Sequence, residues 1–337
     1  MRKISLVVLV FAVVAPALAA KVELIEGKDK VDVKIDGRLF TTYHWGRNWP
    51  KPVLAPVRTP SGIEISRRHP LTELEGGSDD HLHHTGLFFA VDGVNGTKFW
   101  NNVEPFPQIR HKAIKGIVSG ENSGKMVATS LWIDENGTVL LEDERTMTFL
   151  AGGSESEYAI DFSLDMTAKV DKVVFEDTEE GVFAIRVADC LREKGPKTFL
   201  KPGDPAPKES IRGTGVYLSS NGDTTAKQAW GKRARWMVLQ GVKDGKVVGI
   251  AIYNHPESLN YPTYWHVRNY GLFSANPLGQ GDFQRQDDYE KNPIIPLKLT
   301  LQRDEKVHFR FLVVAYEGAK TTHNFEKQFR QFESSRY

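Results

Sequence analysis

Three of the ten histidines in the chain lie within four consecutive positions, as His81, His83 and His84. They follow two aspartates in a glycine-rich stretch, residues 76–86. In an extended chain, side chains alternate between two faces, so His81 and His83 would share a face that His84 does not. A same-face His-x-His pair can chelate a divalent metal ion, or it can place two imidazoles around one polar substrate. A polar loop with solvated or hydrogen-bonded histidines is the alternative interpretation.

A second group of histidine, arginine and aromatic residues occurs far downstream. Its members are His255, Tyr264, Trp265, His266, Arg268, Tyr270 and Asn276. Aromatic rings stack on the apolar faces of pyranose rings, and forked donors such as arginine bind sugar hydroxyls. The group therefore favours a sugar-binding site. The alternative is that Trp265 and Tyr270 belong to the core and that Arg268 forms a structural ion pair.

Together the two groups indicate acid–base chemistry on a sugar. An imidazole that titrates near pH 7 can remove a proton from a hydroxyl or from a carbon beside a carbonyl, and Arg268 can stabilise the resulting oxyanion. The candidate catalytic residues are His81, His83, His84, His255, His266 and Arg268. The candidate substrate-binding residues are His44, Arg67, Asn95, Trp100, Tyr264, Trp265, Tyr270 and Asn276. If the reaction uses one divalent metal ion, His81 and His83 are its candidate ligands.

Signatures of several common enzyme classes are absent from the sequence. It has no Gly-x-Ser-x-Gly nucleophile motif, no phosphate-binding glycine loop and no His-Glu-x-x-His zinc motif. Acidic residues are spread evenly, so no pair of carboxylates for glycoside hydrolysis stands out. Lys+Arg 44 against Asp+Glu 43 gives a net charge of +1, which provides no electrostatic basis for binding nucleic acid or an anionic membrane.

The chain after its first twenty residues has the pattern of an all-β protein. Strict alternation of apolar and polar residues over 31–35, followed by Asp36-Gly37, predicts a strand and a tight hairpin. Similar segments recur along the chain with turn residues between them, which predicts a large antiparallel β-sandwich formed by one domain, residues 21–337. Phe325, Phe329 and Phe332 have helical spacing, so we expect a short C-terminal helix that begins after Thr322.

The first twenty residues have the features of a signal peptide. A basic start precedes an apolar run over residues 4–14, and a small-residue cleavage pattern ends at Ala19-Ala20. The run is too short for a comfortable transmembrane helix, so we expect an exported, soluble mature protein in the periplasm or outside the cell. Cys190 is the single cysteine and can form no disulfide within the chain, so we expect a small buried residue there.

Three sequence blocks resemble a known family. Residues 80–100 contain Asp-His-x-His-His-x-Gly-Leu-x-Phe-Ala, residues 180–188 read Glu-Gly-Val-Phe-Ala-Ile-Arg-Val-Ala, and residues 255–277 contain Pro-Thr-Tyr-Trp-His-Val-Arg-x-Tyr-Gly-Leu-Phe. These blocks resemble the secreted bacterial "methane oxygenase PmoA-like" family of unknown function over nearly the whole mature chain. The sequence departs from the usual family pattern at His69, Leu82 and Thr85.

The resemblance has implications for fold and context. It implies a β-supersandwich similar in outline to galactose mutarotases and polysaccharide lyases. Family members tend to occur beside sugar oxidoreductases and proteins that act on keto-glycosides. The family name itself does not imply an activity, because a particulate methane oxygenase subunit is an integral membrane protein and no later stretch of this chain is long and apolar enough to span a membrane.

The leading hypothesis is an exported carbohydrate-active enzyme, a lyase, hydrolase or epimerase, that acts on a sugar or keto-glycoside by histidine-centred acid–base chemistry. Its ligand would be a carbohydrate or glycoside, with or without a divalent metal ion. A glycan-binding β-sandwich without catalytic activity is the second hypothesis. A redox-metal oxygenase, as the family name suggests, is the third, although no ligand set in the sequence is distinctive of a redox metal.

Overall fold

The computed structural model describes residues 19–46, 49–73, 75–101, 107–152, 154, 156–194, 198–210, 212–286 and 293–336. The predicted signal peptide lies outside these residues, except for Ala19 and Ala20. Among the described helices, none is long and apolar enough to cross a membrane.

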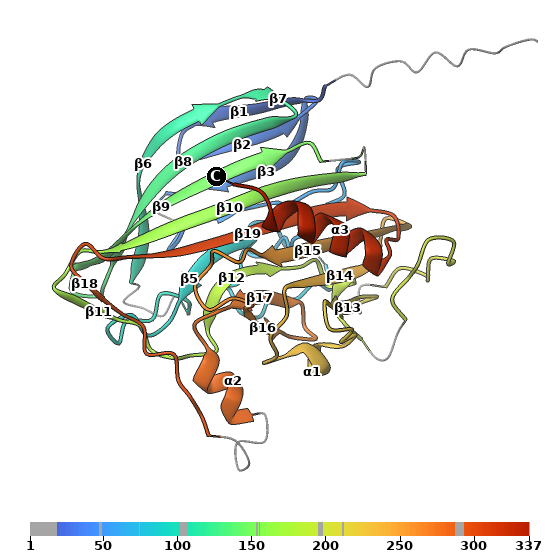
Figure 1. Ribbon diagram of the computed structural model, residues 1–337. Coiled ribbons are helices and arrows are strands. Elements are labelled where there is room, and N and C mark those ends of the chain that lie inside the picture. The colour runs from blue at the N-terminus through green and yellow to red at the C-terminus, as the bar shows by residue number, and fades with distance from the viewer. Residues whose placement is uncertain are drawn as a thin grey trace, which may run out of the picture.

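Nearly all of the regular structure in this part of the chain is antiparallel β-sheet. The first large sheet has the order β16 (Tyr264–Val267), β17 (Leu272–Asn276), β12 (Gly181–Arg186), β5 (Leu87–Val91), β4 (Val53–Leu54), β3 (Arg38–His44), β2 (Lys30–Ile35), β1 (Lys21–Gly27) and β7 (Gly120–Glu121). The second has the order β13 (Val216–Ser219), β14 (Trp236–Lys243), β15 (Lys246–Asn254), β19 (Lys306–Glu317), β10 (Glu157–Ala168), β9 (Val139–Leu150), β8 (Ser123–Ile133) and β6 (Gln108–Val118). In Figure 1 these two sheets form stacked, twisted layers.

The smaller elements are few. Strands β11 (Lys172–Val174) and β18 (Thr300–Gln302) pair with each other. The α-helices in the described residues are α1 (Ala226–Ala229), α2 (Gln280–Gln286) and α3 (Thr322–Glu333), and a 3₁₀ turn spans Asp189–Leu191. The prediction of an all-β antiparallel fold with a short C-terminal helix is therefore confirmed.

Local sequence explains the first hairpin. Val31, Val33 and Ile35 are completely buried on one face of β2. Asp36 and Gly37 both have positive φ, 49° and 75°, as a two-residue turn that matches the twist of its strands requires. Ile35 pairs with Arg38 directly across this turn. The predicted strand and hairpin are confirmed.

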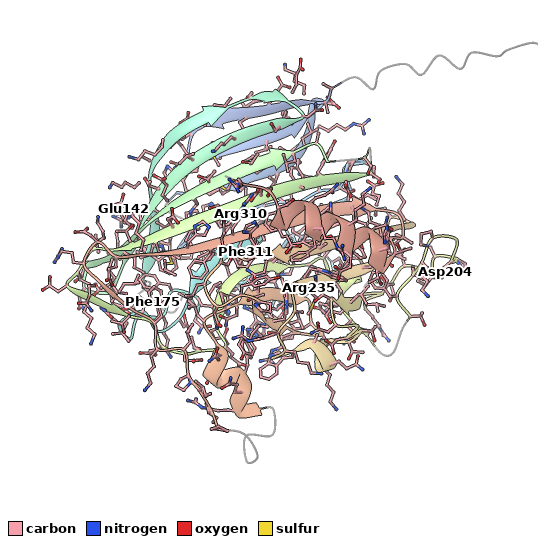
Figure 2. All side chains as sticks on the ribbon, viewed as in Figure 1. Glu142, Phe175, Asp204, Arg235, Arg310 and Phe311 are labelled. Carbon is pink, nitrogen blue, oxygen red and sulfur yellow. The ribbon has the colours of Figure 1, made fainter. Side chains whose placement is uncertain are left out.

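Aromatic residues fill the space between the two large sheets. Phe183 of β12 stacks on Phe311 of β19 with ring centroids 4.7 Å apart and lies 4.8 Å from Phe162 of β10. Phe89 of β5 contacts Phe309 of β19 at 5.3 Å. Because side chains alternate along a strand, a residue next to one of these phenylalanines on the same strand faces away from the shared core. Arg310, labelled beside Phe311 in Figure 2, is an example on β19.

Helix α3 covers the outer face of the eight-stranded sheet (Figure 1). Its phenylalanines Phe325, Phe329 and Phe332 are buried against residues of β14, β15 and β19, as the helical spacing predicted. The N-cap is Thr321, one residue before the predicted position, because its side chain accepts a hydrogen bond from the backbone N–H of Asn324. Since α3 covers this face, β19 is buried on both sides along most of its length.

The outer face of the nine-stranded sheet is built from the alternate residues of β5, β12, β17 and β16. Opposite Ala184 of β12 stand Phe88 of β5 and Ser274 of β17, and opposite Ser274 stands His266 of β16. Their neighbours Phe89, Phe183 and Phe273 point into the core. The same outer face therefore holds His266 of the downstream group and Phe88, whose ring lies 6.3 Å from that of His84 in the histidine loop.

Candidate functional site

The two sequence groups meet at the carboxyl end of β12. This strand lies between β5 and β17 and is antiparallel to both, so both neighbours begin where β12 ends. The histidine loop precedes β5 and the Arg268–Tyr270 turn precedes β17. Backbone hydrogen bonds join the three segments: Arg186 N donates to Gly86 O at 3.1 Å, and Val187 N donates to Gly271 O at 3.0 Å.

Both connecting glycines are required by the geometry. Gly86 has φ +58°, and a Cβ there would lie 2.5 Å from the carbonyl oxygen of Leu54. Gly271 has φ +97°, and a Cβ there would lie 3.0 Å from a side-chain carbon of Val187. Residues other than glycine adopt this left-handed region only at a cost. Each loop therefore enters its strand at a fixed place.

The extended conformation predicted for the histidine loop is wrong. His81 has φ +48°, and the backbone N–H of His84 donates to His81 O at 2.9 Å, which closes a turn. The turn brings all three imidazoles together in place of the predicted alternation. Ring centroids are 4.2 Å apart for His83 and His84, 5.0 Å for His81 and His84, and 5.7 Å for His81 and His83.

Arg67 holds the loop in this shape through its backbone oxygens. One terminal nitrogen, Nη1, donates to the carbonyl of Asp80 at 2.6 Å, and the other, Nη2, donates to those of His81 at 2.9 Å and His84 at 3.0 Å. The side chain is almost completely buried. These charge-assisted bonds satisfy three carbonyl groups that the turn leaves without strand partners.

Asp80 links the loop to β12 and orients His81. Its Oδ1 accepts from Arg186 Nη2 at 2.7 Å and from Arg67 Nη1 at 3.3 Å, and its Oδ2 binds His81 Nδ1. Burial by itself would raise the pKa of Asp80, but the Arg186 and His81 contacts outweigh it and hold that pKa below its ordinary value. An ionised Asp80 fixes the proton of His81 on Nδ1, which leaves Nε2 as the basic nitrogen.

The other two imidazoles of the loop are neutral near pH 7. Burial lowers the pKa of His83 to about 3, and the neighbouring cations Lys51 and Arg67 act in the same direction. Burial also puts the pKa of His84 well below its ordinary value. Neutral imidazoles can donate and accept hydrogen bonds without adding charge.

Tyr270 brings the downstream group into contact with the loop. Its ring lies 5.0 Å from His81 with 11° between the planes, and the guanidinium carbon of Arg186 lies 4.7 Å from its centroid. Burial raises the pKa of Tyr270 above its ordinary value, although Arg268 and Arg186 oppose the shift. The phenol is therefore protonated at neutral pH and can donate a hydrogen bond.

His266 and Arg268 form a neighbouring layer on the same outer face. Arg268 Nε donates to His266 Nε2 at 3.0 Å, and its Nη2 donates to both carboxylate oxygens of Glu179 at 3.2 Å. Its guanidinium lies 5.1 Å from the ring of Trp230. Burial lowers the pKa of His266 to about 3, so this imidazole is also neutral. Burial and the neighbouring Glu179 raise the pKa of Glu180 to about 7.

His255 lies away from the histidine loop. It follows β15 of the other large sheet, where its ring packs edge-on against Phe332 of α3 at 4.9 Å. Its Nδ1 accepts from the backbone N–H of Glu257 at 3.2 Å, and its Nε2 faces Arg310 Nη1 at 3.4 Å. None of these contacts involves the other candidate histidines.

Several candidate binding residues have structural partners outside the loop. Trp265 points into the core, and its Nε1 donates to Ala234 O at 3.0 Å. The Asn276 side chain donates to the carbonyls of Thr178 and Glu179 at 2.9 and 2.8 Å.

The remaining candidates are dispersed in the same way. His44 Nε2 lies 3.0 Å from Ala55 O. The Asn95 side chain bonds the backbone of Lys172 and Val174 in a turn. Tyr264 packs under Arg233 and lines a separate cavity of about 410 Å³.

Trp100 and Lys51 complete the surroundings of His84. The Trp100 ring is fully buried, 5.5 Å from that of His84 and 5.0 Å from that of Phe88. Lys51 Nζ donates to Trp100 O at 3.1 Å, and burial lowers its pKa to about 7. The sequence interpretation did not include Lys51, Asp80 or Arg186 among the site residues. A charged residue inside the apolar run of β12 is the one signal that pointed to Arg186.

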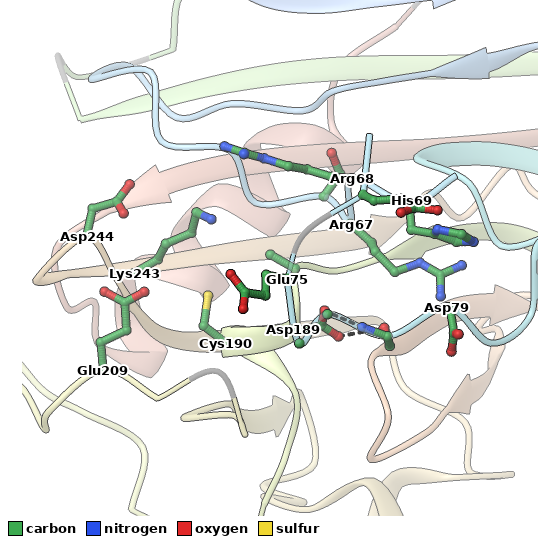
Figure 3. Close-up of a pocket in the computed structure, with 16 residues that line it drawn as sticks. Arg67, Arg68, His69, Glu75, Asp79, Asp189, Cys190, Glu209, Lys243 and Asp244 are labelled. Carbon is green, nitrogen blue, oxygen red and sulfur yellow. Dashed lines mark hydrogen bonds between the residues drawn. The ribbon is translucent and has the colours of Figure 1, made fainter. Parts of the chain in front are cut away.

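A cavity of about 710 Å³ is lined in part by residues 75–79, just before the histidine loop (Figure 3). Its lining includes Arg67, Ser78, Asp189 and the buried Cys190. Asp189 accepts from the backbone N–H and hydroxyl of Ser78 at 2.9 and 2.6 Å, shown as dashed lines in the figure. Burial raises the pKa of the Cys190 thiol to about 11, which keeps it protonated.

The described side chains contain no group of three or more His, Cys, Asp or Glu residues arranged to hold a metal ion. His81 and His83, the predicted ligand pair, lie side by side, but Asp80 already occupies one nitrogen of His81. A metal ion there would use His81 Nε2 and an imidazole nitrogen of His83.

Comparisons with known proteins place the chain in a family. No curated protein matches it. A solved structure that it resembles is a 4-alpha-glucanotransferase from Thermococcus litoralis, with 9% sequence identity and a TM-score of 0.29. That match covers 89% of this chain and 40% of the glucanotransferase, so this chain spans well under half of the other protein. The comparisons do not confirm the methane oxygenase name. Because a single family model matches residues 30–330, the chain belongs to the group described as "Family of unknown function (DUF6807)".

Proposed function

We propose that this protein is an exported carbohydrate-active enzyme that acts on a sugar or keto-glycoside by general acid–base chemistry centred on His81. The observation that carries the proposal is the Asp80–His81 pair. Asp80 is ionised, is held by two arginines and binds Nδ1 of an imidazole whose side chain is 41% exposed. A carboxylate that orients a solvent-accessible imidazole is a recurrent arrangement for a general base.

The groups around His81 suit the remaining tasks of such a reaction. His83 and Tyr270 both contact the His81 ring, and both are neutral hydrogen-bonding groups near pH 7. In the proposed reaction His81 Nε2 removes a proton from a hydroxyl or from a carbon beside a carbonyl. Tyr270 or His83 donates a hydrogen bond to the oxygen on which negative charge develops. Arg268 and His266 support the turn that carries Tyr270 and act as positioning residues.

The assignment of a sugar rests on the chemistry of the cluster and on the sequence resemblance. Several neutral donors and acceptors lie close together beside buried aromatic rings, which is a combination that polyhydroxylated ligands require.

The proposal is tested by turnover of a panel of sugars, uronates and keto-glycosides with the wild-type protein and a His81→Ala variant. We expect a product with the wild type and a rate at least about 100-fold lower with the variant. His323→Ala is the matched control, because His323 is exposed at the start of α3 and lies beside a different cavity. Equal rates for the wild type and His81→Ala on a true substrate would overturn the proposal.

The two other hypotheses predict different results for the wild type and its histidine variants. A glycan-binding protein without catalytic activity would bind a sugar saturably, release no product and tolerate His81→Ala. A redox-metal enzyme would contain stoichiometric metal, as would a metal-assisted form of the leading hypothesis, and a His81/His83 double-alanine variant would lose it. Mass spectrometry of the purified proteins measures that metal content directly.

A further inference from the structure

Four buried N–H groups around the histidine loop have no hydrogen-bond partner among the residues that the structure describes. They are Arg67 Nε, His84 Nε2, Trp100 Nε1 and Arg186 Nε. A buried donor without a partner costs about 1–3 kcal/mol, and native proteins leave few of them. These four are among sixteen such atoms in the described residues, and they gather around one loop, so a ligand or ordered water is needed to supply their acceptors.

All four atoms are donors. The Nε atoms of arginine and the indole nitrogen of tryptophan carry a hydrogen and cannot accept. His84 Nδ1 lies 3.5 Å from Arg186 Nη1, which can only donate, so Nδ1 is the acceptor and the proton of this neutral imidazole lies on Nε2. The region therefore presents donors that need acceptors.

The four side chains form one contact network. His84 touches both Trp100, with centroids 5.5 Å apart, and Arg186. Arg186 and Arg67 share the same oxygen of Asp80. Each of the four side chains is at least 98% buried. A ligand that reaches this network would be almost completely removed from water on that side.

The charge balance favours an anionic ligand. Among the described residues, Asp80 is the acid in ion-pair contact with both Arg67 and Arg186, so two guanidinium groups share one carboxylate at contact distance, while Asp189 and Asp79 also act electrostatically on Arg67. Lys51, whose own pKa burial lowers to about 7 and which interacts electrostatically with Asp92, is close enough to His84 to contribute to the lowered pKa of that imidazole. A sugar hydroxyl would add one more hydrogen-bond donor to a region that already presents four donors. A carboxylate instead brings two oxygens that only accept hydrogen bonds.

We propose that this network binds the carboxylate of an acidic sugar, so that the substrate of the enzyme is a hexuronate or a glycoside that contains one. The inference rests on the proposed function for the sugar part of the ligand. It adds the chemical class of substrate and gives Trp100, His84, Arg67 and Arg186 the role of carboxylate-binding residues.

The indole N–H of Trp100 is a direct probe of this site. In protein labelled with 15N at the tryptophan indoles, the Trp100 signal is assigned by its loss in Trp100→Phe. The labelled protein is titrated with D-glucuronate and D-galacturonate, and in parallel with D-glucuronamide, in which a neutral amide replaces the carboxylate. We expect the Trp100 signal to shift with a uronate at an affinity about tenfold or more above that for the amide.

Two internal controls make the result specific. The indole N–H of Trp132 is already bound to Asp143 at 2.7 Å between the sheets, so its signal should not move. Tyr316→Phe removes a buried hydroxyl on the α3 side of the other sheet and should leave uronate binding unchanged. Trp100→Phe keeps an aromatic ring but should weaken uronate binding about five- to tenfold while changing amide binding little.

The outcomes separate this inference from the proposed function. Equal affinity for uronate and amide would overturn the inference, and the sugar-binding function would stand. A Trp100 signal that no uronate shifts would also overturn it, because water alone would then serve the four donors. The proposed function would in that case still be decided by the His81→Ala comparison.

Discussion

Asp80 accepts a hydrogen bond from Arg186 at 2.7 Å although 106 residues separate them in the chain. The same carboxylate binds His81, so a strand in the middle of the nine-stranded sheet determines the orientation of an imidazole in an exposed loop. Since Arg186 also packs on Tyr270, one buried guanidinium connects the two sequence groups. The Asp80–Arg186 contact thereby fixes the histidine loop to the nine-stranded sheet.

Removing the charge of Asp80 tests its role in orienting His81. In Asp80→Asn the amide can bind His81 in either direction, so the imidazole loses its fixed tautomer. We expect turnover to fall about 10²- to 10⁴-fold. The variant also leaves Arg67 and Arg186 without an anion, so its thermal unfolding should be measured alongside its activity. Wild-type activity in a folded Asp80→Asn protein would show that the pair is structural.

The hydroxyl of Tyr270 can be separated from its ring. Tyr270→Phe keeps the stacking on His81 and the cation–π contact with Arg186 but removes the phenolic donor. We expect kcat to fall at least about tenfold with the unfolding free energy changed by less than about 1 kcal/mol. Tyr270→Ala should lower both kcat and the free energy of unfolding. Unchanged kcat in Tyr270→Phe would assign Tyr270 to packing alone.

The buried neutral histidines predict how stability depends on pH. The folded-state pKa of His266 is about 3, below the ordinary value of 6.5, so between these values the unfolded chain binds more protons. Stability is therefore retained above about pH 6.5 and lost as the pH falls towards 3, by up to about 1.4 kcal/mol per pH unit for one such group.

His266→Gln provides the check, because glutamine keeps an acceptor for Arg268 Nε and does not titrate. Urea unfolding at pH 7, 6 and 5 should show a shallower loss of stability in the variant than in the wild type. Identical slopes would mean that His266 is not buried in its neutral form.

The tight entry of the histidine loop into β5 predicts an intolerant glycine. Gly86→Ala would place a Cβ 2.5 Å from Leu54 O at a backbone φ of +58°. We expect the free energy of unfolding to fall by about 2 kcal/mol or more. Gly96→Ala is the matched control, because Gly96 has φ +81° with no atom within 4 Å of its Cβ position. It should cost only about 1 kcal/mol. Thermal unfolding of both variants measures the difference, and equal losses would contradict the close contact.

The sequence was sufficient to predict the sheets but not the histidine loop. Alternation in β2 and the helical spacing of Phe325, Phe329 and Phe332 are local patterns, and each determined its element. The conformation of His81 depends on Arg67, which binds three carbonyl groups of the loop from another segment. No periodicity within residues 76–86 could indicate that contact.

Strand order explains the other differences. His255 and His266 are close in sequence, but one follows β15 in the eight-stranded sheet and the other lies in β16 at the edge of the nine-stranded sheet. The contribution of Arg186 likewise depends on β12 lying between β5 and β17, which sequence spacing does not reveal. Trp265 alternates with His266, and its position in the core follows from which face of β16 meets the other sheet.

The most direct test of the central claim is solvent deuterium exchange followed by proton NMR. The protein is incubated in D2O with a panel of uronates and with methyl 3-keto-α-D-glucoside, whose C–H groups beside the carbonyl exchange when a base removes their protons. We expect the wild type to exchange such a proton in at least one of these sugars faster than buffer does, and we expect His81→Ala not to do so. Equal exchange by the wild type and His81→Ala would contradict the role of His81 as the base.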